Sequence, residues 1–142
     1  MNIKPIHPNF QLPVRASDLA GGYDLVMPEG GIVHYDEPEG VMFGLGFAAE
    51  VPEGYVAFLL PRSGKGSKLG VSLNNTVGMI DADYRGEWKV SLRVRNHESV
   101  HWQAGERLIQ MVLVPALAVD FNIVDELGDT ARGEGGFGST GV

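Results

Sequence analysis

The stretch at residues 88–95 reads Trp88-Lys89-Val90-Ser91-Leu92-Arg93-Val94-Arg95, and its apolar and polar side chains alternate without a miss. Side chains of an extended chain point alternately to the two faces of a sheet. The alternation therefore predicts a β-strand with one buried face.

Apolar residues run continuously, rather than alternating, in two other stretches. Residues 55–60 and 108–114 are such runs, and each is closed by a proline. Short continuous runs of this kind are typical of more deeply buried strands. Residues 119–123 alternate again and predict a further half-buried strand.

Glycine and proline divide the chain into short elements. The sequence holds 20 Gly and 8 Pro among 142 residues, and both residue types weaken helix interiors. Glycines at positions 30–31, 40, 54 and 105 separate the expected strands as turns. One short helix is expected at Ser63–Leu69, with Ser63 as its cap. We therefore expect an all-β fold, a jelly-roll-like β-barrel or sandwich with at most one short helix.

Composition and charge limit the class of protein. With 44% hydrophobic and 20% charged residues, the chain has the composition of one globular domain. The net charge of −7 disfavours binding to DNA or RNA, because nucleic-acid binders usually carry a basic surface. No secretory signal and no apolar run near the roughly 18 residues of a membrane span is visible. The absence of cysteine excludes disulfides and thiolate zinc sites, and it fits a reducing compartment, so we expect a cytoplasmic protein.

The segment at residues 128–142 differs from the rest of the chain, because it holds six glycines and only one large apolar residue, Phe137. Such a segment buries too little to order itself, so one interpretation is a frayed terminus. The other is a mobile lid over a nucleotide, because glycine amides approach phosphates closely, Arg132 is a bidentate donor and Phe137 can stack on a base. We therefore divide the chain into a β domain at residues 1–127 and a flexible C-terminal arm at residues 128–142.

Two stretches contain the residue types that phosphate chemistry needs. Residues 61–68 combine Gly and Ser with Arg and Lys, which is typical of an anion-binding turn or of a solvated basic loop. Residues 78–87 include Asp81, Asp83 and Tyr84. This second stretch is either a polar hairpin turn or the source of a carboxylate that deprotonates a water beside a phosphate.

Other candidate residues are weaker when each is taken alone. Asp24 follows a glycine turn that enters a strand, and Gln110 lies inside an apolar strand, where its amide needs a partner. The four histidines are scattered without an acid-rich ligand set, so no histidine metal site is expected. No Gly-x-Ser-x-Gly elbow is present, which disfavours serine-hydrolase chemistry.

In their order along the chain, these stretches resemble the five motifs of the trimeric dUTP pyrophosphatases (dUTPases). The five segments are residues 20–25, 61–70, 75–87, 105–110 and 132–141, which together span nearly the whole chain. The third and fifth are the most specific. The sequence departs from the family pattern at Lys65-Gly66-Ser67, where many relatives carry apolar or small residues, and at the extra Gly22.

The resemblance implies a jelly-roll-like β fold and a homotrimer whose active sites lie at subunit interfaces, each closed by the arm of a neighbouring subunit. It implies hydrolysis of dUTP to dUMP and pyrophosphate by attack of water on the α-phosphate, which keeps uracil out of DNA and supplies dUMP for thymidylate synthesis. The implied cofactor is Mg²⁺, held by the substrate's phosphates and water rather than by protein ligands. The sequence does not indicate an additional protein partner, although one is compatible with it.

The resemblance also implies roles for single residues. Asp81 matches the carboxylate that activates the attacking water. Tyr84 matches the residue whose ring lies under the deoxyribose and leaves no room for a 2′-hydroxyl. Asn75, Gly78 and Met79 belong to the hairpin whose backbone reads uracil.

The remaining matches concern the phosphates and the arm. Asp24 matches an acid that supports Arg62. Phe137, beside Gly138, matches the aromatic residue that caps uracil. The positions that match phosphate contacts are Arg62, Ser63, Gly64, Gln110, Arg132, Ser139 and Thr140.

Two other functions compete with this one. A dCTP deaminase, from a related family, needs a carboxylate in the strand that follows Tyr84, and residues 88–97 contain none. A trimer that binds dUTP for regulation or protein interaction is the second alternative. The intact Asp81 argues against a protein without catalysis.

Overall fold

The alternating stretch forms strand β9 (Lys89–Val94), the central strand of a three-stranded sheet. The structure is a computed structural model that describes residues 1–37 and 39–136. Val90 and Leu92 are buried in it, whereas Lys89 is exposed. The predicted strand with one buried face is therefore confirmed.

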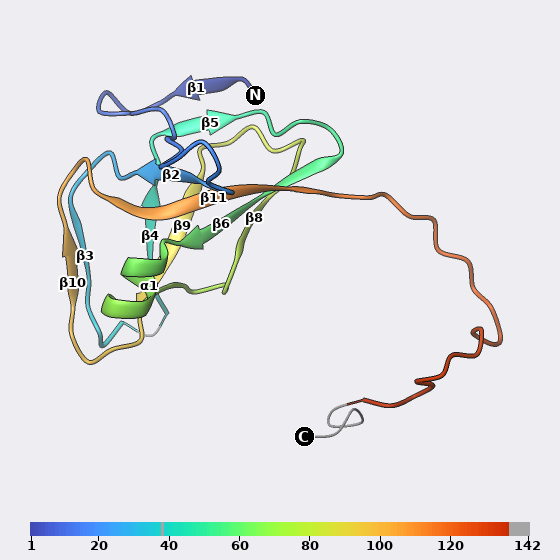
Figure 1. The fold of residues 1–142 in the computed structure, drawn as a ribbon. Helices are drawn as coiled ribbons and strands as arrows, with labels where there is room; N and C mark the ends of the chain where they lie inside the picture. Colours follow the sequence, from blue (N-terminus) through green and yellow to red (C-terminus); the bar gives the residue numbers. More distant parts are fainter. Residues whose placement is uncertain (38, 137–142) are drawn as a thin grey trace.

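The described residues form eleven strands and one short helix, shown in Figure 1. The other elements are β1 (Ile3–Pro5), β2 (Tyr23–Val26), β3 (Gly31–Val33), β4 (Val41–Gly44), β5 (Phe47–Ala49), β6 (Tyr55–Pro61), α1 (Ser63–Leu69), β7 (Val71–Leu73), β8 (Gly78–Ile80), β10 (Val100–Trp102) and β11 (Arg107–Pro115).

Two larger antiparallel sheets make up the body of the molecule. One has the strand order β2-β11-β6-β8 and the other β4-β9-β7, while β1 pairs with β5 and β10 with β3 in two-stranded sheets. Among the described residues these sheets are separate and do not close into a barrel. The expected all-β fold is confirmed, and of its two forms the sandwich is the one observed.

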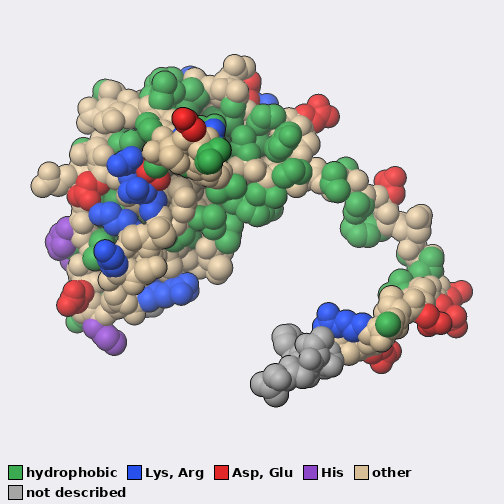
Figure 2. Space-filling view, in the orientation of Figure 1, with side chains coloured by type: hydrophobic (Ala, Val, Ile, Leu, Met, Phe, Trp, Pro, Cys, Tyr) green, Lys and Arg blue, Asp and Glu red, His purple; other side chains and the backbone are tan. Residues whose placement is uncertain are grey.

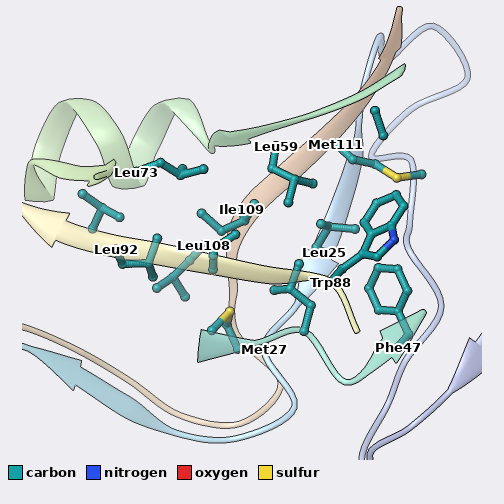
Figure 3. Packing of buried hydrophobic residues seen from close by; sticks show 14 of the residues in the cluster. Leu25, Met27, Phe47, Leu59, Leu73, Trp88, Leu92, Leu108, Ile109 and Met111 are labelled. Atoms are coloured by element: carbon teal, nitrogen blue, oxygen red, sulfur yellow. The ribbon is translucent and has the colours of Figure 1, made fainter. Parts of the chain in front are cut away.

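Both larger sheets contribute to one hydrophobic core (Figure 3). Leu25, Leu59 and Ile109 come from the four-stranded sheet, and Leu73 and Leu92 come from the three-stranded sheet. Each of these side chains is almost completely removed from water. Their burial is the main favourable contribution to folding, because apolar surface leaves water in proportion to its area.

Trp88, directly before β9, is the largest fully buried side chain. Its ring lies beside that of Phe47, with the ring centroids 5.1 Å apart, and Phe47 lies beside Phe10 at 5.5 Å. The indole N–H of Trp88 has no hydrogen-bond partner among the described residues. Trp88 therefore stabilises the fold by packing rather than by hydrogen bonding.

The two continuous apolar runs are confirmed as strands β6 and β11, which pair with each other. The strand predicted at residues 119–123 is wrong. This segment follows β11 and leaves the body of the molecule (Figure 1), and it forms no strand. Phe121 is 92% exposed and Ile123 is fully exposed, because no strand in the described part of the chain lies beside them.

The predicted helix is confirmed at both ends, but the predicted cap is wrong. Arg62 leaves β6 in an extended conformation and occupies the N-cap position, so Ser63 is the first helical residue and no side chain caps the helix. Gly70 ends the helix in the left-handed conformation that favours glycine, with φ of 71°. The one helix in the described part of the chain is not long and apolar enough to cross a membrane.

We predict that Trp88→Ala lowers the free energy of unfolding by about 3–5 kcal/mol, because it leaves a cavity in the aromatic cluster. Trp88→Phe is expected to cost clearly less, since the lost N–H has no described partner. Chemical denaturation at one fixed protein concentration measures both values. Equal losses for the two variants would contradict stabilisation by packing of the ring.

Candidate active site

A buried carboxylate organises the first part of the site. Asp24 on β2 is only 6% exposed. Its Oδ1 lies 2.7 Å from Nε of Arg62, and its Oδ2 accepts a hydrogen bond of 3.1 Å from Nη1 of Arg107. A buried carboxylate without partners would destabilise the fold strongly, and two guanidinium groups compensate it here. The structure thus brings Asp24 and Arg62 together.

The sequence analysis assigned no role to Arg107, although its side chain completes this cluster. Its main-chain carbonyl also accepts a hydrogen bond of 3.3 Å from Nη1 of Arg62. A basic residue at the beginning of a strand is ordinary in a sequence. Only the pairing of β11 with β2 brings Arg107 to Asp24.

Gln110 faces the same region from the middle of β11. Its Nε2 donates a hydrogen bond of 3.2 Å to the carbonyl of Pro61, directly before Arg62. A Cβ atom at Gly22 would lie 3.1 Å from Oε1 of Gln110 and 3.0 Å from the carbonyl oxygen of Met111. The extra Gly22 therefore allows the chain to pass close to Gln110 where a side chain would crowd it.

Ser63 and Gly64 line a pocket of about 330 Å³ together with Arg62 and with Lys65, Lys68 and Leu69. Figure 2 shows Lys and Arg side chains gathered over α1 and the strands beside it. The chain as a whole carries a net charge of −7. A concentration of cations on such a chain creates a local positive potential, which suits an anionic ligand.

A second pocket, of about 270 Å³, lies at the hairpin between β7 and β8. It is lined by the five residues of the third motif that were predicted to bind the nucleoside or to activate water: Asn75, Gly78, Met79, Asp81 and Tyr84. Residues that the sequence analysis missed complete the lining: Met42, Leu73, Ile80, Lys89, Val90 and Ser91. Lys89 and Ser91 lie on the polar face of β9. Polar side chains are expected there from the alternation of the strand, so they gave no separate signal of a site.

The backbone of this hairpin is held by local contacts. Thr76 has a φ of 67°, and its N–H donates to the Leu73 carbonyl at 3.1 Å. A Cβ atom at Gly78 would lie 3.0 Å from Cβ of Leu59 on β6. Glycine therefore lets β8 lie close against β6, and it leaves the hairpin backbone near the pocket in a defined position.

Asp81 and Tyr84 lie at the two ends of a turn in which the Tyr84 N–H donates to the Asp81 carbonyl at 3.2 Å. The Tyr84 hydroxyl donates to the Glu87 carbonyl at 3.1 Å. The Tyr84 ring also occupies the place that a Cβ atom of Gly86 would take. The orientation of the ring is therefore set by one hydrogen bond and by the absence of a side chain at Gly86.

Among the described residues, the structure does not bring Arg132 to the other predicted site residues. Its Nε donates to the Gly135 carbonyl at 2.8 Å within the arm, which extends away from the body in Figures 1 and 2. The predicted residues Phe137, Gly138, Ser139 and Thr140 lie outside the described residues. Within a single chain the predicted site is therefore in separate parts, and the two pockets have no lining residue in common.

Within residues 1–37 and 39–136, no group of three or more His, Cys, Asp or Glu side chains is placed to hold a metal ion. Asp24 is engaged by two arginines, and Asp81 lies in the other pocket. A metal ion at this site would have to receive most of its ligands from a bound anion and water.

Known proteins with similar sequences and structures identify the family. The family model for dUTPase matches residues 8–141. A deoxyuridine 5'-triphosphate nucleotidohydrolase of Hahella chejuensis is 45% identical over 132 residues, which are 92% of this chain and 87% of that protein. One from a Hydrogenobaculum species is 43% identical over 140 residues, which are 99% and 96% of the two chains.

Solved structures agree with the sequence relatives. A mutant dUTPase of Staphylococcus bacteriophage 80alpha, solved with dUpNHpp, has a TM-score of 0.90 and 27% identity, covering 99% of this chain and 98% of that one. A mutant dUTPase from phage phi11 of S. aureus, in which a structural Mg(II) ion is coordinated, has a TM-score of 0.79 and 23% identity, covering 88% and 96%. At that identity the second likeness concerns the fold alone. The family model, the sequence relatives and the fold agree, and the chain belongs to the dUTPase family.

Proposed function

We propose that the protein hydrolyses dUTP to dUMP and pyrophosphate. Membership of the dUTPase family supports this reaction. The observation that carries it in the structure is the pocket in which Asp81, Tyr84 and the hairpin backbone line one space. A carboxylate, an aromatic ring and a hairpin backbone in one pocket are what a nucleoside and an attacking water require.

In the proposed reaction, Asp81 accepts a proton from a water whose oxygen attacks the α-phosphorus. The bond between that phosphorus and the oxygen bridging to the β-phosphorus breaks, and pyrophosphate leaves with the electron pair. The hairpin backbone holds uracil, and the Tyr84 ring under the sugar excludes a 2′-hydroxyl by steric clash.

The phosphates are proposed to bind at Arg62, Ser63, Gly64 and Gln110. Asp24 keeps the Arg62 guanidinium oriented, so the enzyme does not have to order that side chain during the reaction. When Mg²⁺ is bound to the triphosphate, it offsets part of the phosphate charge and favours departure of pyrophosphate. The absence of a described three-ligand protein cluster is compatible with an ion that arrives with the substrate.

We propose that the protein is a homotrimer in which neighbouring copies complete each site. Three observations support an oligomer: the two pockets have no lining residue in common, Arg132 lies away from both, and the segment after β11 exposes apolar side chains. Leu117, Phe121 and Ile123 are almost fully exposed in the single chain. Apolar surface of this extent usually belongs to an interface. The arm, residues 128–142, is proposed to close over a site of another copy.

We also propose that the enzyme acts in the cytoplasm. The absence of cysteine supports this location, because a protein that works in a reducing compartment needs no disulfides.

Asp81→Asn is predicted to lower kcat for dUTP by about 10²–10⁴-fold, because the variant retains the shape of the side chain but loses the general base. Pyrophosphate release measures kcat, and calorimetry with dUpNHpp should show binding close to that of the wild type. Asp83→Asn is the matched control. It removes the same charge only two residues from Asp81, but the Asp83 side chain does not line the pocket. Undiminished turnover by the Asp81→Asn enzyme would remove Asp81 from the mechanism.

Gly86→Ala is predicted to displace the Tyr84 ring and to relax the discrimination between dUTP and UTP by roughly tenfold or more. The ratio of kcat/KM for the two nucleotides measures this effect. Tyr84→Phe separates the two influences on the ring, because it keeps the space at Gly86 and loses only the hydrogen bond to the Glu87 carbonyl. If Gly86→Ala kept the discrimination of the wild type, the ring position would not determine it.

Deletion of residues 128–142 is predicted to leave the trimer intact and to lower turnover of dUTP by roughly a hundredfold, because the arm orders and encloses the substrate. Light scattering gives the mass, and pyrophosphate release gives the rate. A monomeric mass for the full chain would contradict the trimer, whereas full activity without the arm would contradict the lid.

A further inference from the structure

Helix α1, whose first residues line the proposed phosphate pocket, is weakly held by its own sequence. Two of its seven residues are glycines, none of its residues is buried, and no side chain caps it. Glycine weakens helices, and most helices in proteins depend on a buried apolar face. The position of α1 must therefore depend on contacts with the rest of the chain.

Lys65 forms an ion pair between α1 and the body. Its Nζ donates a hydrogen bond of 2.8 Å to Oε2 of Glu106, and the Lys65 side chain is only 25% exposed. Among the described residues, no other side chain of α1 takes part in an ion pair. Lys65 is also one of the residues at which the sequence departs from the dUTPase pattern.

The carboxylate that receives this bond is itself oriented. The other oxygen of Glu106, Oε1, accepts a hydrogen bond of 2.9 Å from the Gln103 N–H in the turn before β11. The Lys65 hydrogen bond, and after it that of the Gln103 N–H, lower the pKa of the Glu106 carboxyl below its ordinary value. Glu106 is therefore ionised at neutral pH and held in position to receive Lys65.

Glu106 is followed directly by Arg107, which belongs to the Asp24 cluster. Arg62 binds Asp24 and the Arg107 carbonyl, while Lys65 binds Glu106. Residues at the beginning of β11 thus contact Arg62, directly before Ser63 and Gly64, and Lys65, directly after them. The Arg62 N–H also donates to the Leu108 carbonyl at 2.9 Å. Together these contacts restrain residues 62–64 against rotation as well as translation, which a single contact would not.

We propose that Lys65 is a positioning residue, whose ion pair with Glu106 holds residues 62–64 in the orientation that binds phosphates. The role of residues 62–64 in binding phosphates rests on the proposed function, whereas the ion pair between Lys65 and Glu106 does not depend on it. A direct contact between the Lys65 ammonium and a phosphate is the alternative, and it predicts a different pattern of variants.

The test compares Lys65→Met, Glu106→Gln and the double variant. If Lys65 positions residues 62–64, each single variant raises KM for dUTP by about two- to fivefold, which is the range expected for a partly exposed ion pair. The double variant then has a KM no higher than that of either single variant, because both remove the same interaction. If Lys65 binds phosphate directly, Glu106→Gln frees the ammonium and leaves KM equal or lower. That result would overturn the proposal.

A second measurement does not depend on activity. Amide hydrogen exchange of α1 in the free protein should be faster in Lys65→Met and Glu106→Gln, and Lys65→Arg should restore both the exchange rate and KM. Lys4→Met, on β1 away from the loop, removes the same charge and should change neither.

Unchanged exchange in Lys65→Met would show that the ion pair does not hold α1, and faster exchange with unchanged KM would show that the tie does not position the loop. A wild-type protein that releases no pyrophosphate from dUTP would instead contradict the proposed function, and the exchange data would still test the tie.

Discussion

The carboxylate of Asp24 is buried, and its charge is tolerated only because Arg62 and Arg107 both reach it. These three residues come from three different places in the chain: β2, the junction of β6 with α1, and the beginning of β11. The charges meet only when β2, β11 and β6 lie in that order with their observed register. A shift of one residue along β2 would turn Asp24 to the opposite face of the sheet. Residues 62–64, which are proposed to bind phosphates, are therefore in place only when the sheet is correctly assembled.

Strand β6 connects this cluster with the second pocket. The carbonyl of its last residue, Pro61, accepts the Gln110 hydrogen bond, and residues 62–64 follow directly. Its middle residues pair with β8, where Gly78 lies close to Leu59 and carries the hairpin. One rigid strand thus supports both the residues proposed to bind phosphates and those proposed to bind the nucleoside. A site built on such a strand needs less reorganisation than one built on loops alone.

The single chain leaves both its surface and its site incomplete. The segment after β11 carries exposed apolar side chains on an extended backbone, and Figure 2 shows others on the adjoining face of the body. Arg132 lines neither pocket, and the arm to which it belongs extends away from the body (Figure 1). The proposed assembly with further copies of the same chain would account for both features.

The sequence alone determined the elements whose signals are local. The alternation at residues 88–95 and the apolar runs at 55–60 and 108–114 predicted three strands correctly. The helix was also predicted at Ser63–Leu69, although the cap predicted for it at Ser63 was wrong. The same reasoning failed at residues 119–123, because alternation indicates a half-buried strand without saying which surface covers it. Only the tertiary structure brought Arg107 to Asp24, 83 residues away, and Lys65 to Glu106, 41 residues away. The physical reason is that the period of a strand is a property of neighbouring residues, whereas a pair of charges across the sheet depends on which strands lie together and in which register.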